Sequence, residues 1–436
     1  SPCLLSVFLE DGGYRQFNWT PCRTPRLCSK YPVAEKESVF LRYRCFIFTG
    51  EASGDFLGSR LMQALGSEYV FQGVGGPLMC ATGLHPLLPL SRFGQMGFFA
   101  VLRHFRRLKK DFYFLLETVM QQKPDLVLLI DFPGWNLRFS QALRKRGFSG
   151  RIVQYVCPSV WAHGKHRIQQ MVNTLDLLLT LYPFEPPLFS HTHLQVQFVG
   201  HPLLEVPPPS SLSGQTKPPL LALFPGSREQ EVIRHAPLFL QAAALMEQEC
   251  PGMQFALSCL SESFQSQLEK NIRTYAPQMV DRVKIVPYSQ KETLLQAATF
   301  AIAKSGTVTL ELALHQIPTI AVYNLSYIDF LVAKYLWRIQ LPFYCLVNLL
   351  AEKEIFPEYI GPHIHPSLLA TAAGSLWQNP MARKNMQDDC AGLRARLQSP
   401  LSPLSPLSLW PLFPSPRSRP SRLSQPSRPC RPFRPR

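Results

Sequence analysis

An apolar run that ends in a small-residue turn and reopens as a helix is the unit from which this chain is built. In its first clear occurrence, residues 46–65, the run suits a strand buried on both faces, and Gly50 closes it. Ser53 is placed to cap the following helix, and Asp55 to complement its positive end. Taken alone, the turn is either an ordinary strand-to-helix connection or a cradle in which Gly50 and Gly54 let a ligand approach backbone N–H groups.

The same unit recurs along the chain and predicts parallel sheets covered by helices. It is found at residues 72–79, 125–136, 150–162, 175–185, 196–205, 220–231, 253–258, 283–288, 300–316 and 318–324. Residues 206–219 are rich in Pro and Ser and interrupt the series, so we interpret them as a linker. We therefore expect an α/β fold with two doubly wound, Rossmann-like domains, at 45–205 and 220–398, that face each other across a ligand-binding cleft.

The two ends of the chain lack this pattern. Residues 1–44 show no sustained periodicity and are interpreted as an N-terminal extension, and the Ser at position 1 suggests an incomplete or processed N-terminus. Residues 399–436 alternate Pro, Ser and Arg, which predicts a disordered tail. Such a tail is either simply solvated or a basic arm for nucleic acid or anionic lipid.

Composition narrows the function classes. The formal net charge of the 436 residues is +16, and seven of the arginines lie in the 36 residues from 401 onwards. The remaining excess suits an anionic substrate or membrane surface as well as a polynucleotide. The 11 cysteines form no C-x-x-C pair, which favours neither a disulfide framework nor structural zinc and suggests a reducing cytosol. No apolar run approaches the ~18 to 20 residues of a membrane span.

The segment PGSREQE, residues 225–231, lies between a predicted buried strand and a long predicted helix. Gly226, Ser227 and Arg228 therefore occupy a helix N-terminus, where backbone N–H groups and a guanidinium both match phosphate oxygens. We expect a diphosphate there. The alternative is a surface arginine in an ordinary turn.

A second cluster, KSGTVTLELAL, occupies residues 304–314. Ser305, Gly306 and Thr307 follow a predicted strand, and Glu311 lies one helical turn beyond Thr307. A carboxylate there can accept both hydroxyl groups of a ribose while the loop N–H groups bind phosphate. Alternatively, Thr307 only caps a helix and Glu311 is only solvated.

Asp131 follows five apolar residues at the predicted carboxyl end of a strand. That position directs a side chain towards the cleft, and desolvation there raises the pKa of a carboxyl group into the range of a general base. An Asp that merely caps the following turn is the competing interpretation.

Residues 91–116 have the pattern of a basic amphipathic helix. Phe98 and Phe105 belong to its apolar stripe, and Arg103, Arg106 and Arg107 lie beside them. Such a helix can lie in an anionic membrane interface. Packing of the stripe on the sheet is the usual alternative in an α/β domain.

Together, the ordered motifs resemble those of the lipid-A-disaccharide synthase family over residues 45–398. They are GEASGD (50–55), GVGGPLM (73–79), GQMGFFAVL (94–102), IDFPGWN (130–136), CPSVWA (157–162), YPFEPPLF (182–189), FVGHPLLE (198–205), FPGSREQEV (224–232) and SGTVTLELAL (305–314). The resemblance implies a GT-B fold and an inverting, metal-independent hexosyltransferase without a cofactor. The implied substrates are UDP-2,3-diacylglucosamine and 2,3-diacylglucosamine 1-phosphate, and the products are a β-1,6-linked disaccharide 1-phosphate and UDP.

The resemblance also assigns residues. It places the catalytic base at Asp131, the UDP-phosphate contact at Arg228, and nucleotide contacts at Glu311 and Asn348. The acceptor-side wall of the cleft falls on residues of the GEASGD and GVGG turns, namely Glu51, Ser53, Gly54, Asp55, Gly75 and Gly76. The chain departs from the family pattern at Ala100, Gly134, His163 and Val347, none of which is assigned to the chemistry.

The membrane stretch gains weight from the same resemblance, which implies a cytoplasmic enzyme held peripherally on the inner membrane of a Gram-negative cell. An anionic membrane surface is thus an expected partner, and nucleic acid is not. Two alternatives remain: an enzyme that resembles UDP-N-acetylglucosamine epimerase and acts on soluble substrate, and a non-catalytic lipid-binding descendant of the synthase. Acyl-chain length, oligomeric state and source organism do not follow from the residues.

Overall fold

The computed structural model of the chain describes residues 43–93, 98–162, 164, 166–205, 218–336 and 341–398. The tail predicted for 399–436, all but two residues of the extension predicted for 1–44, and all but two of the linker predicted for 206–219 lie outside these ranges. The proposed domain boundaries therefore stay predictions.

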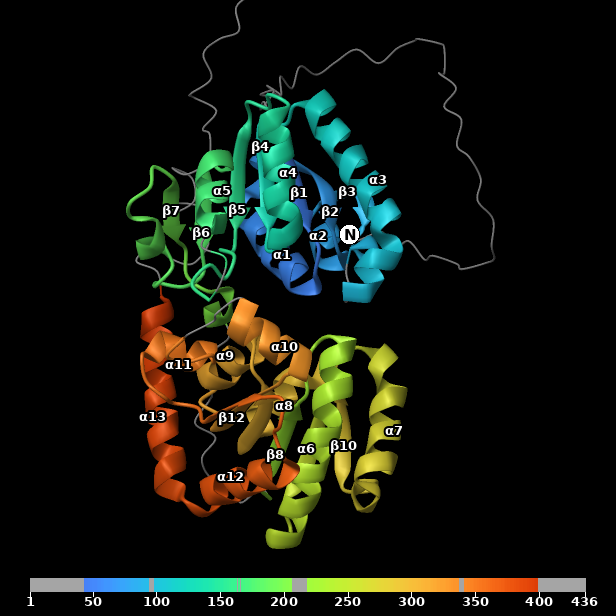
Figure 1. The fold of residues 1–436 in the computed structure, drawn as a ribbon, viewed down its shortest axis with the longest axis vertical. Coiled ribbons are helices and arrows are strands. Elements are labelled where there is room, and N and C mark those ends of the chain that lie inside the picture. The colour runs from blue at the N-terminus through green and yellow to red at the C-terminus, as the bar shows by residue number, and fades with distance from the viewer. Residues whose placement is uncertain are drawn as a thin grey trace, which may run out of the picture. The chain divides into compact units, whose positions relative to one another are not determined.

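The first sheet contains seven parallel strands in the order β3-β2-β1-β4-β5-β6-β7 (Figure 1). Its strands are β1 (Tyr43–Thr49), β2 (Tyr69–Gly75), β3 (His85–Pro89), β4 (Leu126–Ile130), β5 (Arg151–Tyr155), β6 (Leu177–Thr180) and β7 (Gln195–Phe198). Its helices are α1 (Ala52–Leu65), α2 (Pro77–Ala81), α3 (Phe98–Gln122), α4 (Pro133–Lys145) and α5 (His166–Thr174). Short η helices occur at Gly66–Glu68, Leu90–Arg92, Pro186–Phe189 and Pro202–Glu205.

Alternation along the strands builds a core on both faces of this sheet. Ile47 packs with Leu61 and Met62 of α1 on one face, whereas Phe46 and Phe48 belong to the cluster on the other face. The latter cluster also contains apolar residues of α3, α4 and α5. Since successive side chains of a strand point to opposite faces, the continuous apolar runs of the sequence are those of strands covered on both sides.

The second sheet has six parallel strands in the order β10-β9-β8-β11-β12-β13. Its strands are β8 (Leu220–Phe224), β9 (Gln254–Cys259), β10 (Val283–Pro287), β11 (Phe300–Lys304), β12 (Thr319–Asn324) and β13 (Glu358–Gly361). Its helices are α6 (Glu229–Glu249), α7 (Gln265–Tyr275), α8 (Lys291–Ala297), α9 (Thr307–Leu314), α10 (Tyr327–Leu331), the π-helix η8 (Val332–Leu336), α11 (Leu346–Ala351), α12 (Pro366–Gln378) and α13 (Pro380–Leu397). Short η helices occur at Glu262–Phe264, Pro277–Met279 and Tyr288–Gln290.

The two sheets share one connectivity. Each begins at an inner strand, adds two strands on one side, and then crosses back to add the remaining strands on the other side. The order reverses between β1 and β4 in the first sheet and between β8 and β11 in the second. The prediction of two doubly wound domains is confirmed.

The two sheets lie within one compact unit of the chain, and contacts join them. Tyr182, Phe184 and Leu203, which follow strands of the first sheet, pack against the core of the second. In addition, an Nη of Arg394 on α13 donates a hydrogen bond to the Leu204 carbonyl at 2.6 Å.

Candidate active site at the two switch points

The four sequence clusters assigned to chemistry follow four particular strands. The GEASGD turn follows β1, Asp131 follows β4, the PGSRE turn follows β8, and the SGT turn follows β11. These are the strand pairs at which the strand order of each sheet reverses. In open parallel sheets, ligands bind outside the carboxyl ends of the strands at such reversals, so the topology brings the predicted residues to ligand-binding positions.

Asp131 has a constrained backbone. Its φ is 48° and that of Phe132 is 45°, so two consecutive non-glycine residues adopt the left-handed conformation, which is a strained arrangement frequent at functional sites. The Asp131 N–H donates to the Tyr155 carbonyl at 2.9 Å, and its own carbonyl accepts from the Gln154 and Asn136 side chains. The backbone is thus fixed on both sides of the carboxyl group.

The carboxyl group of Asp131 is tuned towards basicity. Burial, followed by the negative charge of Glu51, raises its pKa from 3.8 to about 6, whereas a hydrogen bond from the Phe132 backbone and the charge of Arg228 oppose this. Helix α4 is capped without any side-chain hydrogen bond, so Asp131 does not act as the helix cap that was its alternative interpretation.

The GEASGD turn lies against the Asp131 loop. A Cβ atom on Gly50 would come within 2.6 Å of the Phe132 ring, so glycine is needed for this approach. Helix α1 begins at Ala52 with Glu51 as its N-cap residue, and Ser53 is exposed one position further on. The expectation that Ser53 caps this helix is wrong, because the helix starts before it.

Asp55 has a structural task that the sequence did not reveal. Its buried carboxylate accepts hydrogen bonds from the backbone N–H groups of Gly76, Leu78 and Met79 at 2.8, 3.0 and 3.0 Å. It therefore caps α2 while lying in the first turn of α1. A Cβ on Gly76 would come within 2.5 Å of that carboxylate.

The neighbouring glycines are needed for packing. A Cβ on Gly54 would come within 1.9 Å of the Thr49 hydroxyl, and one on Gly75 within 2.6 Å of Leu84. Gly54, Gly75, Gly76 and Asp55 therefore fix the shape of the two turns after β1 and β2. Their direct contact with an acceptor stays a prediction.

Arg228 connects the two sheets. One of its terminal nitrogens donates to both carboxylate oxygens of Glu51, at 3.0 and 3.1 Å. The Arg228 side chain is 67% exposed and that of Glu51 is 34% exposed, so the pair is accessible to a ligand. This contact places the predicted phosphate-binding arginine beside the turn next to Asp131.

The PGSRE turn is organised by Glu231, a residue that the sequence alone did not mark as functional. One oxygen of Glu231 accepts the N–H groups of Ser227 and Arg228, at 3.0 and 3.3 Å, and the other lies 2.9 Å from the ammonium group of Lys304. Burial opposes the ionisation of Glu231, but Lys304 and these hydrogen bonds outweigh it and lower its pKa. Gly226, with φ 127°, lets the chain pass over the Glu231 side chain.

The SGT turn leads into α9. The Ser305 N–H donates to the Val322 carbonyl at 2.7 Å, Gly306 is the N-cap residue, and Thr307 is the exposed first residue of the helix. Thr307 is thus not the cap. The Glu311 carboxylate lies 2.6 Å from the ammonium group of Lys291, so a ribose would have to share it with that lysine.

Asn348 is buried in α11 and uses its side chain inside the protein. Its amide nitrogen donates to the Phe356 carbonyl and to Glu358, at 2.7 and 2.8 Å. Its oxygen accepts the Ile355 and Phe356 N–H groups at 2.8 and 2.9 Å. The side chain holds the loop that precedes β13, and a nucleotide contact from Asn348 stays a prediction.

Most of the predicted membrane stretch forms helix α3, but within the helix only the side chains from Arg106 onwards are described. The side chains of Phe98, Arg103 and Phe105 lie outside the described residues, and those of Arg106 and Arg107 are exposed. Leu108 and Phe112 pack against the core of the first sheet. This part of the apolar stripe therefore follows the alternative interpretation, in which the stripe packs on the sheet. Tyr113 and Phe114 are each 47% exposed.

Sequence analysis also missed a buried group near the junction of the sheets. Burial raises the pKa of Glu185 to about 8, although hydrogen bonds from the Tyr182 and Leu181 N–H groups oppose the shift. Burial lowers the pKa of His201 to about 4, and its ring lies beside that of Tyr182. A glutamate amid the aromatic residues of YPFEPPLF was the one available signal of a buried carboxyl group.

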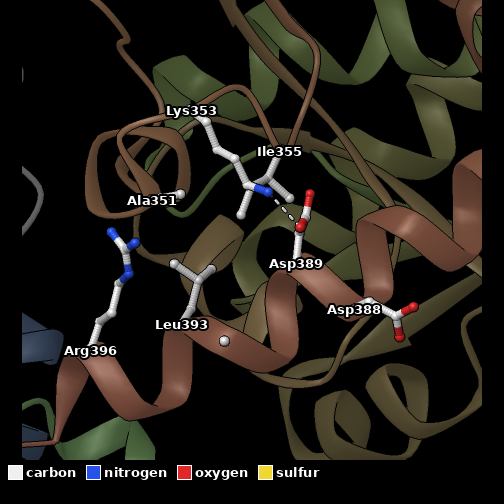
Figure 2. Close-up of a pocket in the computed structure, with 8 residues that line it drawn as sticks. Ala351, Lys353, Ile355, Asp388, Asp389, Leu393 and Arg396 are labelled. Carbon is white, nitrogen blue, oxygen red and sulfur yellow. Dashed lines mark hydrogen bonds and ion pairs between the residues drawn. The ribbon is translucent and has the colours of Figure 1, made fainter.

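A surface hollow on the second domain lies apart from these residues (Figure 2). Its volume is about 190 Å³, and its lining includes Lys353, Asp388, Asp389 and Arg396. Figure 2 shows Asp389 facing Lys353, with which it forms an ion pair at 2.5 Å. None of the predicted site residues lines this hollow, and the predicted cleft between the domains stays a prediction.

Comparison with known proteins decides the family. The model of the lipid-A-disaccharide synthetase family matches residues 45–402. The chain belongs to this family. The resemblance inferred from the sequence motifs is thereby confirmed.

Individual family members agree with this. The lipid-A-disaccharide synthase of Pseudomonas putida KT2440 is 37% identical over 342 residues, which cover 76% of this chain and 88% of the relative. That of Chlamydia pneumoniae is 36% identical over 371 residues, or 82% of this chain. The chain spans only 61% of the length of the Chlamydia relative.

Solved structures support the GT-B fold of the family at much lower identity. The UDP-GlcNAc 2-epimerase from Neisseria meningitidis, solved with UDP-GlcNAc, has a TM-score of 0.53 and 9% identity, with 85% of this chain and 98% of that one covered. Sucrose-phosphate synthase from Thermosynechococcus elongatus has a TM-score of 0.52 and 15% identity, with the same coverage. These likenesses show the fold alone.

Proposed function

We propose that this chain is an inverting glycosyltransferase of lipid A synthesis, which joins UDP-2,3-diacylglucosamine to 2,3-diacylglucosamine 1-phosphate. The observation that carries the proposal is the arrangement of Asp131, Glu51 and Arg228 at the switch points of a chain that belongs to the family. A basic carboxylate and a guanidinium that suits phosphate lie at the same site.

Asp131 is the proposed general base. The acceptor 6-hydroxyl group transfers its proton to the Asp131 carboxylate as its oxygen bonds to the anomeric carbon of the donor. A pKa of about 6 leaves Asp131 ionised near neutral pH and more basic than an ordinary aspartate. A fixed backbone at φ 48° holds the carboxylate in place for this step.

Arg228 is the proposed stabiliser of the leaving group. As the bond between the anomeric carbon and the phosphate oxygen breaks, its electron pair stays with UDP, whose charge Arg228 and the N-terminal ends of α6 and α9 offset. One displacement inverts the anomeric centre and yields the β-1,6 linkage. Neither a metal nor a cofactor enters the proposed step.

Donor binding in this proposal requires an exchange of partners. In the structure, Arg228 binds Glu51, and the Ser227 and Arg228 N–H groups bind Glu231. A diphosphate offers stronger charge and more acceptor oxygens than either carboxylate. We infer that it takes over Arg228, while Glu51 remains beside Asp131 as a negative neighbour.

Within the described residues, no helix combines the length and the apolar character that a bilayer span requires. We also propose that the chain attaches peripherally to the anionic cytoplasmic face of the inner membrane. This proposal rests on the acylated substrates and on the exposed Arg106 and Arg107 of α3.

A product assay tests the function. Purified protein is incubated with UDP-2,3-diacylglucosamine and 2,3-diacylglucosamine 1-phosphate, and the products are identified by mass spectrometry. We expect a disaccharide 1-phosphate and equimolar UDP from wild type and little of either from Arg228→Ala. Wild type that releases no UDP would favour the non-catalytic, lipid-binding alternative.

The epimerase alternative is less well supported. Epimerases share the fold at 9–12% identity, whereas the family members at 36–37% identity are disaccharide synthases. Incubation with UDP-N-acetylglucosamine alone separates the two: an epimerase interconverts the sugar without an acceptor, and the proposed transferase leaves it unchanged.

A further inference from the structure

The segment Tyr327–Leu336, formed by α10 and η8, is mostly apolar, yet it is poorly buried. Eight of its ten residues are apolar, and only Asp329 and Lys334 carry charge. No described side chain of the segment is buried: Ile328 is 73% exposed, Tyr335 64% and Tyr327 60%. Phe330, Leu331 and Val332 are half-buried, whereas no described residue covers the apolar side chains of Tyr327, Ile328 and Tyr335.

Polar contacts hold the segment beside the N-terminal part of α6. It follows β12, whose last residue, Asn324, donates its N–H to His235 at 3.0 Å. Arg234, next to His235 on α6, donates to the Asn324 carbonyl at 3.4 Å and to Asp329 at 3.3 Å. The segment is thus fastened to the first turns of α6, the helix that begins directly after Arg228 (Figure 1).

We propose that Tyr327–Leu336 is a bilayer-contact surface that inserts Ile328 and Tyr335 into the headgroup region of an anionic membrane. The proposal rests on the proposed function. The diphosphate of the proposed donor binds at the start of α6, and its acyl chains must come from a bilayer. Protein surface near the start of α6 therefore has to contact that bilayer. The contact is additional to the α3 stretch, which belongs to the first domain.

Side-chain chemistry favours a membrane as the occupant. Tyrosine combines an apolar ring with a polar tip and is enriched at membrane interfaces. The ammonium group of Lys334 lies over the rings of Phe330 and Tyr335, at 5.8 and 5.3 Å from their centroids, and is exposed where it can meet lipid phosphate. A second protein chain fits less well, because one ten-residue segment offers less than the roughly 800 Å² per partner of a stable interface.

Vesicle binding of the full chain tests the proposal. Wild type and the double variant Ile328→Ser/Tyr335→Ser are co-sedimented with vesicles of phosphatidylethanolamine and phosphatidylglycerol. The loss of two inserted apolar side chains is expected to weaken partitioning by about tenfold or more. Met381→Ser is the matched control, since Met381 is 68% exposed on α13, and it should bind like wild type.

A charge variant adds a second readout. Lys334→Glu should weaken binding to phosphatidylglycerol-containing vesicles and leave the weaker binding to pure phosphatidylcholine unchanged. Thermal unfolding of each variant, compared with wild type, verifies that it is folded, as expected for substitutions of exposed side chains.

Two results would overturn the proposal. One is equal partitioning of wild type and the double variant. The other is a change of oligomeric state in the double variant on size exclusion, which would assign the segment to a second copy of the chain. Turnover of donor and acceptor in detergent micelles tests the proposed function separately from the membrane contact. The double variant should keep wild-type activity in micelles. An inactive wild type would refute the proposed function, whereas vesicle binding would still decide whether the segment contacts the bilayer.

Discussion

Glu51 and Arg228 lie 177 positions apart in the sequence, yet one nitrogen of Arg228 donates to both oxygens of the Glu51 carboxylate, at 3.0 and 3.1 Å. Both residues also act on Asp131: the charge of Glu51 raises its pKa and that of Arg228 lowers it. The pair therefore joins the turn that holds the proposed base to the turn that holds the proposed phosphate ligand. A donor that withdraws Arg228 would leave Asp131 with its negative neighbour and so make it a stronger base.

Glu51→Gln should move the acidic limb of the pH–rate profile. Asp131 must be ionised to accept a proton, so the rate of wild type is expected to fall below about pH 6. Without the charge of Glu51, the pKa of Asp131 decreases, and the limb of kcat/KM shifts to lower pH. Glu117→Gln on α3 is the control, because the exposed Glu117 pairs with Arg146, and its profile should match wild type. An unmoved limb in Glu51→Gln would refute the coupling.

Glu185→Gln should change how stability depends on pH. Because burial raises the folded-state pKa of Glu185 from 4.5 to about 8, the neutral carboxyl group favours the fold. That contribution is complete below about pH 4.5 and is lost as the pH rises through about 8. The amide stays neutral and can still accept from the Leu181 and Tyr182 N–H groups, so the variant should become more stable than wild type as the pH rises across this window. Urea unfolding at several pH values measures this, and parallel curves would contradict it.

Asp55→Ala should destabilise the fold. It leaves three backbone N–H groups at the start of α2 without their acceptor, at an expected cost of ~2–3 kcal/mol in the free energy of unfolding. Asp388→Ala removes an exposed partner of Lys384 and should cost less than ~0.5 kcal/mol. Equal urea midpoints for Asp55→Ala and wild type would show that the carboxylate has no capping role.

Most of the strands that the sequence predicted are inner strands, although the edge strands β7 and β10 were predicted as well. The apolar run at 220–224 is β8, and the long helix expected after the PGSREQE segment is α6. By contrast, β3 (His85–Pro89) and β13 (Glu358–Gly361) were not predicted. Both lie at sheet edges and are partly exposed, and β3 contains two prolines, so neither shows the continuous apolar run of an inner strand.

Within the candidate site, local signals were predictable and long-range pairings were not. The position of Asp131 at the end of β4 follows from five apolar residues before it, and that of Arg228 from the turn between β8 and α6. The ion pair of Lys304 with Glu231 and the cap that Asp55 provides for α2 each join separate segments of chain. Sequence spacing carries no information about such contacts, because the sheet order that creates them is set by the packing of the whole domain.

The central claim is that this chain transfers a glycosyl group with Asp131 as the base, and Asp131→Asn tests it most directly. The substitution preserves the shape of the side chain and removes its basicity. Disaccharide formation is measured by mass spectrometry under saturating donor and acceptor, together with UDP affinity by calorimetry. We predict that kcat falls by roughly a hundred- to ten-thousand-fold while UDP affinity stays within about twofold of wild type. An Asp131→Asn variant that forms the disaccharide at the wild-type rate would contradict the account.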